Sequence, residues 1–161
     1  MRRFKSQILL SQNAILAGMA YVDLNPVRAK MVGSLGKSKN TGINPRMKKI
    51  AKRQALADGL LAPIAGLTTF QLPKLSEAEY IDFVDKTGRI MHPGKRGLIG
   101  AHEPPALRKL GLDMNHWTMQ VKGIGSGYWC AVGTAEELIE KAAEIGQNWL
   151  CGIGFARLFN G

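Results

Sequence analysis

The sequence has no apolar run close to the length of a membrane span, and it contains only two cysteines. Its first residues, Met1 to Lys5, are basic, but no apolar core with a small-residue cleavage site follows, so we expect no signal peptide. These absences indicate a soluble, cytoplasmic protein that does not contact a membrane. The cysteines, Cys130 and Cys151, do not form a C-x-x-C pair. We expect both to be reduced and buried, and a disulfide between them is the alternative.

Acidic residues are scarce in the first third of the chain. Residues 1–53 hold twelve of the 22 lysines and arginines but only one of the 12 acidic residues, Asp23. This part therefore has a formal charge of +11, whereas the remaining residues together have −1 and the whole chain has +10. Such an uneven charge predicts a polyanionic partner, most often a nucleic acid. The alternative is a hydrated basic surface that only aids solubility.

Several catalytic and ligand-binding motifs are missing. The stretch Gly123–Gly127 is rich in glycine, but Tyr128 stands where a G-x-G-x-x-G motif needs its third glycine. We therefore predict a turn between helices rather than a phosphate-binding loop. No nucleophile elbow or Cys–His arrangement is present. The spacing of the three histidines is not that of metal ligands, which favours surface or capping positions for His92, His102 and His116.

Helical periodicity dominates the chain, with no internal repeat and little strand pattern. Ser11 is suited to cap a helix that runs to about Leu24. The pair Asn25-Pro26 predicts the end of that helix and the start of a second, short one. Asn44-Pro45 repeats the pattern and predicts a basic helix up to about Asp58.

Capping signals predict further helices in the second half. Ser76–Glu79 and Thr134–Glu137 both have the capping-box pattern. Pro104-Pro105 predicts a short helix that ends at Gly111, and Asp113 predicts the cap of the next helix. We expect the tail to pack back onto these helices through its aromatic residues, Trp149, Phe155 and Phe159. The composition divides the chain into a basic part at 1–59, a linker at 60–75 and a helical part at 76–161.

Two pieces of the basic part, taken together, resemble a known family. Arg3-Phe4-Lys5-Ser6 is followed by Met19–Val32, whose centre reads Ala20-Tyr21-Val22-Asp23-Leu24-Asn25-Pro26-Val27-Arg28-Ala29. This order and spacing are similar to the end of the catalytic domain of the single-tyrosine HUH transposases, in their REP-associated branch. A second likeness, to the C-terminal extension of some members, covers Tyr80–Arg89, Lys95-Arg96-Gly97 and Pro104-Pro105.

The resemblance implies a helix-borne tyrosine that attacks a phosphodiester of single-stranded DNA and becomes linked to the 5′ phosphate. A divalent ion, Mg²⁺ or Mn²⁺, polarises the phosphate in such enzymes. Tyr21 matches the nucleophile, and Asn25, one turn later, matches a residue that helps to hold the metal. A phenol with an ordinary pKa of about 10 needs positive charge nearby to attack as a phenolate. We expect the basic residues to contact DNA, namely Arg2, Arg3, Lys5, Arg28, Lys30, Arg46, Lys48, Lys49, Lys52 and Arg53.

The sequence departs from the family because it lacks the metal-binding His-hydrophobe-His motif and the ferredoxin-like sheet that carries it. We therefore expect a mainly α, irregular helical assembly. It would combine the nucleophile helix, as the remnant of a ferredoxin-like α/β catalytic domain, with a small helical C-terminal extension. Such a C-terminal piece of a transposase would bind single-stranded or hairpin DNA, hold no metal and not cleave alone. Its protein partner would be a second copy or a chain with the catalytic domain. The alternatives are a non-catalytic nucleic-acid-binding or regulatory module, in which Tyr21 only packs, and a remnant that folds poorly.

Overall fold

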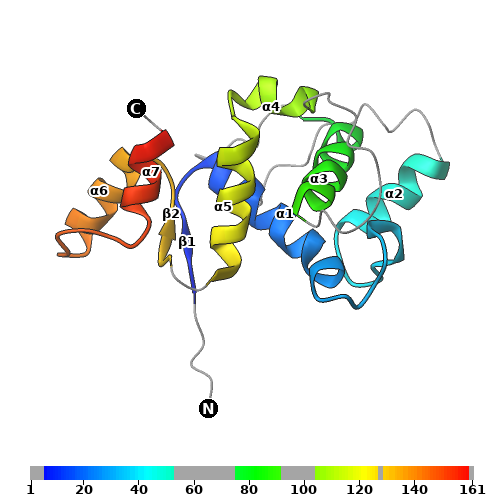
Figure 1. The fold of residues 1–161 in the computed structure, drawn as a ribbon, viewed down its shortest axis with the longest axis horizontal. Coiled ribbons are helices and arrows are strands. Elements are labelled where there is room, and N and C mark those ends of the chain that lie inside the picture. Colours follow the sequence, from blue (N-terminus) through cyan, green and yellow to red (C-terminus); the bar gives the residue numbers. More distant parts are fainter. Residues whose placement is uncertain (1–5, 53–74, 92–103, 127–128, 160–161) are drawn as a thin grey trace, which may run out of the picture.

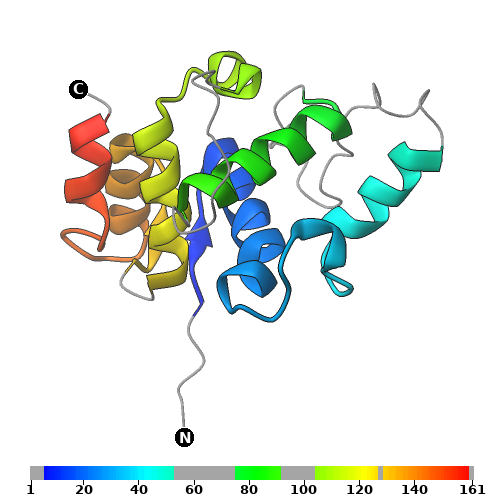
Figure 2. The same cartoon turned by 45° about the vertical axis from the view of Figure 1, so that its right-hand side comes forward.

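The computed structural model describes residues 6–52, 75–91, 104–126 and 129–159 (Figure 1). These residues form a mainly α fold, as the helical periodicity predicts. In chain order the elements are β1 (Ile8–Leu9), α1 (Gln12–Arg28), the 3-10 helix η1 (Leu35–Lys37), α2 (Ile43–Lys52), α3 (Glu77–Met91), α4 (Pro105–Leu110), α5 (Met114–Ser126), β2 (Ala131–Val132), α6 (Ala135–Glu144) and α7 (Ile153–Phe159). Helix α2 lies at one end of the molecule and α6 with α7 at the other, with α1 and α5 between them (Figures 1 and 2).

Helix α1 continues through Asn25-Pro26, so the predicted break and the separate short helix after it are wrong. Its start agrees with the prediction, because the Ser11 hydroxyl accepts a first-turn backbone N–H at 3.1 Å. The proline lies in the last turn, where it removes one hydrogen bond, to the carbonyl of Val22, and Val22 lies on the exposed side of the helix. The burial of Leu24 in the core on the opposite side holds the backbone helical despite the neighbouring proline.

The end of α1 is closed by a left-handed residue that is not glycine. Lys30 has φ +56°, and its backbone N–H donates to the carbonyl of Val27 at 3.1 Å. The N–H of Met31 donates to the carbonyl of Pro26 at 2.9 Å. Together these two bonds form a Schellman motif, in which glycine usually takes the left-handed position because a Cβ atom strains it. The residues directly after α1 therefore cap the C-terminal end of the helix with their own backbone N–H groups.

Helix α2 begins at Ile43, one residue before the predicted cap Asn44. The N–H of Ile43 donates to the carboxylate of Asp23 at 3.1 Å, so another helix supplies the capping group. The side-chain amide of Asn44 instead donates to the carbonyl of Gly36 at 2.9 Å. Because of these two tertiary contacts, the helix starts one residue before the position where Asn44 was predicted to cap it. The predicted C-terminal end near Asp58 lies outside the described residues.

The predicted caps of three later helices are confirmed. Ser76 and Glu79 form both hydrogen bonds of a capping box before α3, at 3.1 and 2.8 Å. Thr134 and Glu137 form both bonds of the second box at the start of α6. The carboxylate of Asp113 accepts two backbone N–H groups in the first turn of α5. These caps are local, because each joins residues no more than three positions apart.

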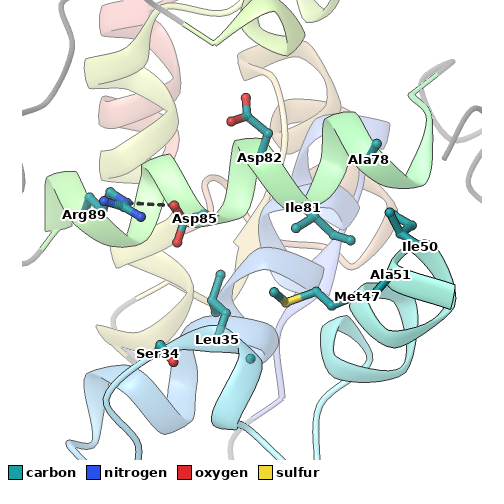
Figure 3. A pocket seen from close by; sticks show the side chains of 11 residues that line it. Ser34, Leu35, Met47, Ile50, Ala51, Ala78, Ile81, Asp82, Asp85 and Arg89 are labelled. Carbon is teal, nitrogen blue, oxygen red and sulfur yellow. Dashed lines mark hydrogen bonds and ion pairs between the residues drawn. The ribbon is translucent and has the colours of Figure 1, made fainter. Parts of the chain in front are cut away.

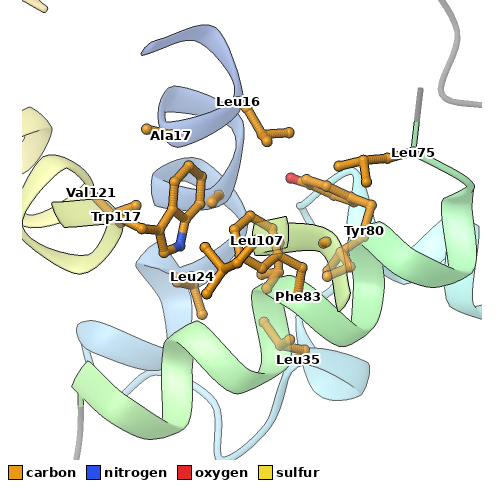
Figure 4. Close-up of a cluster of buried hydrophobic side chains, with 14 residues drawn as sticks. Leu16, Ala17, Leu24, Leu35, Leu75, Tyr80, Phe83, Leu107, Trp117 and Val121 are labelled. Atoms are coloured by element: carbon orange, nitrogen blue, oxygen red, sulfur yellow. The ribbon is translucent and has the colours of Figure 1, made fainter. Parts of the chain in front are cut away.

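The main core lies where α1, α3, α4 and α5 meet (Figure 4). At its centre the rings of Phe83 and Trp117 are 4.5 Å apart. The indole N–H of Trp117 donates to the hydroxyl of Thr87 at 2.8 Å, which satisfies the polar atom of a fully buried side chain. Helices α1 and α3 approach closely at Gly88, where a Cβ atom would lie 2.7 Å from the side chain of Leu24.

A second, smaller cluster lies beside the two-stranded sheet. Strand β1 pairs in parallel with β2, with Ile8 opposite Ala131 and Leu9 opposite Val132. The buried residues of this cluster come from β2, α6, α7 and the turn between the two helices: Ala131, Ala135, Leu138, Ala142, Leu150 and Ala156. Elements from both sides of the predicted linker at 60–75 therefore share cores, while most of that linker lies outside the described residues.

Two predictions about the C-terminal part are wrong. The glycine-rich stretch predicted as a turn forms the last part of α5, up to Ser126. A Cβ atom on Gly123 would lie 2.1 Å from the Trp129 ring, so this glycine makes room for an indole. Trp149, predicted to pack on the helices, is 62% exposed. Phe155 does pack as predicted, with its ring 4.7 Å from that of Trp129.

The two cysteines, Cys130 and Cys151, are free thiols in the structure. Their expected burial is wrong for Cys130, which is exposed, whereas Cys151 is half-buried. The side chain of Phe159 lies outside the described residues. Among the helices that the structure describes, none has the length and apolar character needed to cross a membrane.

Candidate functional site

Tyr21 lies in the middle of α1 and is half-buried against the edge of the main core. The guanidinium carbon of Arg28 lies 4.7 Å from the centre of its ring. This distance is that of a cation–π contact, and seven residues make about two helical turns, so the contact follows from the helix itself. Helix α1 therefore brings together the predicted nucleophile and one predicted DNA-contacting arginine.

The guanidinium of Arg28 is not fully satisfied. Its Nη1 atom is buried and has no hydrogen-bond partner among the described residues. Arginine has five N–H donors, and a buried donor without a partner is uncommon in folded proteins. Contact with the Tyr21 ring offers the charge some compensation, because the face of the ring is electron-rich.

Asn25 lies one turn after Tyr21 and is exposed. Mg²⁺ and Mn²⁺ take several oxygen ligands, usually including carboxylates. Within the part of the chain that the structure describes, no three His, Cys, Asp or Glu residues are grouped to hold a metal. The nearest acidic residue in sequence, Asp23, is buried and has other partners. The described surroundings of Asn25 therefore do not supply a ligand set, and no metal-dependent step can be assigned to them.

Asp23 has a role that its sequence pattern did not predict. It is only 3% exposed, and its carboxylate accepts the N–H of Ile43 at 3.1 Å and the phenol O–H of Tyr80 at 2.8 Å. This one side chain therefore ties α1 to the start of α2 and to α3. Burial and then the negative charge of Asp23 raise the pKa of Tyr80 above its ordinary value, so the phenol remains a neutral donor.

Arg46, on α2, contacts two residues of α3 at the same junction. Its guanidinium carbon lies 5.4 Å from the centre of the Tyr80 ring, and its Nε lies 3.8 Å from a carboxylate oxygen of Glu77. Its charge opposes the rise in the pKa of Tyr80. Arg46 was predicted to contact DNA, but in the structure it forms contacts within the protein.

The remaining cations of this part lie at the surface. Six exposed lysines from the end of α1, η1, the following loop and α2 form no ion pair within the described ranges, and we call them the basic surface: Lys30, Lys37, Lys39, Lys48, Lys49 and Lys52. Four further predicted contacts lie outside the described residues: Arg2, Arg3, Lys5 and Arg53. The basic surface is thus carried by α2 and by the segment that joins α1 to it, and both lie toward one end of the molecule (Figure 1).

An apolar groove of about 610 Å³ lies between η1, α2 and α3, next to the basic surface (Figure 3). Apolar side chains from all three elements line it, among them Leu35, Met47, Ile50 and Ile81. On the α3 side, Asp85 pairs with Arg89 at 2.7 Å. The groove therefore offers apolar contact area, and its charged groups, Asp82, Asp85 and Arg89, all take part in ion pairs along α3.

His116 lies in the first turn of α5, where its ring is 5.5 Å from that of Phe155. Burial lowers its pKa below the ordinary value, and the nearby Asp113 opposes this shift. The structure therefore gives His116 a half-buried packing position rather than the predicted surface or capping one, and Asp113 caps the helix instead. The other two histidines, His92 and His102, lie outside the described residues.

Comparisons of the chain with known protein families, curated proteins and solved structures found no match. The function is therefore argued from the residues of this chain alone. Two features carry that argument: the contact of Arg28 with Tyr21, and the exposed lysines of the basic surface.

Proposed function

We propose that this chain binds single-stranded or hairpin DNA through the basic surface. The observation that carries the proposal is that six exposed lysines, carried by α2 and by the segment that joins α1 to it, have no acidic partner in the described residues. Such like charges repel each other, and a phosphate backbone would neutralise them and release bound counterions. The four arginines and lysines that lie outside the described residues would extend the same contact.

The proposal includes descent from a single-tyrosine HUH transposase of the REP-associated branch. The Tyr21-Val22-Asp23-Leu24-Asn25-Pro26 motif supports it, as does the cation that contacts the ring of Tyr21. Helix α1 would then be the remnant of the ferredoxin-like catalytic domain, and the helices from α3 onward would be the extension. A divalent ion supplies phosphate polarisation in that family. The described donor set around Asn25 does not fit such an ion, so we infer that the chain does not cleave DNA by itself.

The binding test is a salt titration of fluorescence anisotropy with a labelled single-stranded DNA hairpin. Reversing three charges with Lys48→Glu, Lys49→Glu and Lys52→Glu should weaken binding by roughly 100-fold. The slope of log K against log salt should become shallower by about 0.7 for each phosphate that the variant no longer neutralises.

A matched control changes three exposed cations outside the basic surface, Arg108→Glu, Lys122→Glu and Arg157→Glu, and so gives the same net charge. This variant should bind within a few-fold of the unchanged chain. Equal weakening in the two triple variants would show that net charge alone attracts DNA, and the proposed surface would be wrong.

A non-catalytic nucleic-acid-binding module is the second candidate. It is favoured by the half-buried ring of Tyr21, which packs at the edge of the core. Both candidates predict that Tyr21→Phe leaves binding intact. They differ when a chain carrying the His-hydrophobe-His domain is added with Mg²⁺ or Mn²⁺: a transposase remnant should then give a covalent DNA adduct that Tyr21→Phe abolishes. An adduct formed by this chain alone would contradict the inferred lack of cleavage.

A further inference from the structure

The two cysteines lie at one cavity, although they are 21 positions apart in the chain. Cys130 directly precedes β2, and Cys151 lies two residues before α7. Both line a cavity of about 420 Å³ together with the turn that follows α6, including the exposed Trp149. No other cysteine exists in the sequence to compete as a partner within the chain.

The backbones that carry the two thiols are in contact. Gly152 has φ +110°, and a Cβ atom at this position would lie 3.3 Å from the carbonyl oxygen of Ala131 and 3.6 Å from the Trp129 ring. The residue after one cysteine therefore packs directly on the residue after the other. A disulfide needs Cα atoms within about 7 Å of each other, which only such neighbouring segments can supply.

We propose that Cys130 and Cys151 form an intramolecular disulfide when the protein meets a hydroperoxide. Cys130 is the more exposed thiol, so it reacts first. Its thiolate attacks one peroxide oxygen, the O–O bond breaks, and the leaving hydroxide takes up a proton as water. The product at Cys130 is a sulfenic acid.

The half-buried thiol of Cys151 then resolves this intermediate. Its sulfur attacks the sulfenic sulfur, the S–S bond forms, the S–O bond breaks, and a second water leaves. In total two thiols lose two electrons and two protons, and one hydrogen peroxide becomes two waters. The bond encloses residues 131–150, which contain β2 and α6, and fastens the start of β2 to the start of α7.

The experiment treats the full chain with hydrogen peroxide in the presence of dimedone, which traps sulfenic acids. The unchanged chain should lose both free thiols and the mass of two hydrogen atoms, stay monomeric on a non-reducing gel, and recover both thiols with dithiothreitol. Because the bond limits the unfolded chain, the melting temperature should rise by about 5–10 °C.

Two single variants test the order of the steps. Cys151→Ser should accumulate a dimedone adduct on Cys130, whereas Cys130→Ser should react several-fold more slowly and at Cys151. Neither variant should show the rise in melting temperature. The proposal is overturned if the unchanged chain gives only disulfide-linked dimers, if it proceeds to sulfinic or sulfonic acid without losing both thiols, or if Cys130 is the slower residue.

Discussion

Residues 6–52 and residues 75–159 use their charged side chains in different ways. In the first region the single acidic residue, Asp23, is buried, and one of eight cations, Arg46, has an ion pair with a residue that the structure describes. In the second region four of seven described cations have acidic partners: Lys86, Arg89, Lys109 and Lys141. Three of these pairs join residues three or four apart on one helix, the spacing that brings side chains together.

The difference shows how one residue can shape both the interior and the surface. Because Asp23 is occupied in joining α1, α2 and α3, the first region has no carboxylate that could neutralise its lysines. Its described surface is therefore positive, and the acidic helix α6 lies at the opposite end of the molecule (Figure 2). The following predictions test this contrast between a buried carboxylate and surface ion pairs.

The largest effect is expected from Asp23→Ala. The substitution leaves the Tyr80 phenol and the Ile43 N–H buried without an acceptor, so the free energy of unfolding should fall by about 3–5 kcal/mol. Urea unfolding followed by circular dichroism measures this change. Asp82→Ala, which removes a surface carboxylate, is the control and should change stability by less than about 0.5 kcal/mol. Similar losses of stability in the two variants would show that the buried carboxylate contributes no more to folding than a surface carboxylate.

Alkaline pH tests the hydrogen bond that the Tyr80 phenol donates to Asp23 at the same junction. The pKa of this phenol is raised in the folded state, so the unfolded chain loses its proton first, near pH 10. The stability that comes from the neutral phenol is complete below that pH and is lost as the pH rises above it. We expect a decline of up to about 1.4 kcal/mol per pH unit, measured by urea unfolding between pH 9 and 11. Tyr80→Phe should be less stable at pH 9 and should decline less steeply.

A smaller effect is expected at the left-handed residue that follows a helix, because the two regions have different residues at that position. The left-handed position after α4 holds Gly111, with φ +62°, whereas Lys30 holds the corresponding position after α1, with φ +56°. Lys30→Gly should therefore raise the free energy of unfolding by about 1 kcal/mol, because glycine adopts this conformation without strain. The same variant should bind DNA slightly less tightly. A loss of stability would mean that the lysine side chain contributes contacts that outweigh the strain.

The smallest effect is expected at the surface pairs of the second region. Lys86 lies 2.8 Å from Asp82, but both side chains are well exposed. Lys86→Ala should lower the free energy of unfolding by no more than about 0.5 kcal/mol, and the loss should disappear in 1 M salt. A larger, salt-independent loss would show that the pair stabilises α3 in another way.

The sequence predicted those features of the fold that depend on neighbours in the chain. The capping boxes at Ser76 and Thr134 were predictable because each box is complete within four residues. The predicted helix break at Asn25-Pro26 was wrong, because burial of Leu24 in a core built from later helices keeps α1 regular. The glycine-rich stretch was predicted wrongly because Gly123 leaves room for the ring of Trp129, six positions further along, and a turn pattern does not reveal such packing.

The candidate site was predictable to a similar degree. The lysines of the basic surface followed from the uneven charge, because hydrated cations need no particular partner. The role of Asp23 did not, because its two partners lie 20 and 57 positions further along the chain. The only available signal was the isolation of this one acid among twelve basic residues. The contact of Arg28 with Tyr21 could have been inferred from their spacing on one helix, once α1 was known to be continuous.

The parallel pairing of β1 with β2 bears on how the protein is made. Gln7 donates its side-chain amide to the carbonyl of Trp129 at 2.7 Å, across 122 positions of the chain. During synthesis the backbone groups of β1 therefore stay without their partners until β2 has also left the ribosome. The segment before α1 is then open to pairing with other strands, and a chaperone that covers such segments should raise the yield of folded protein.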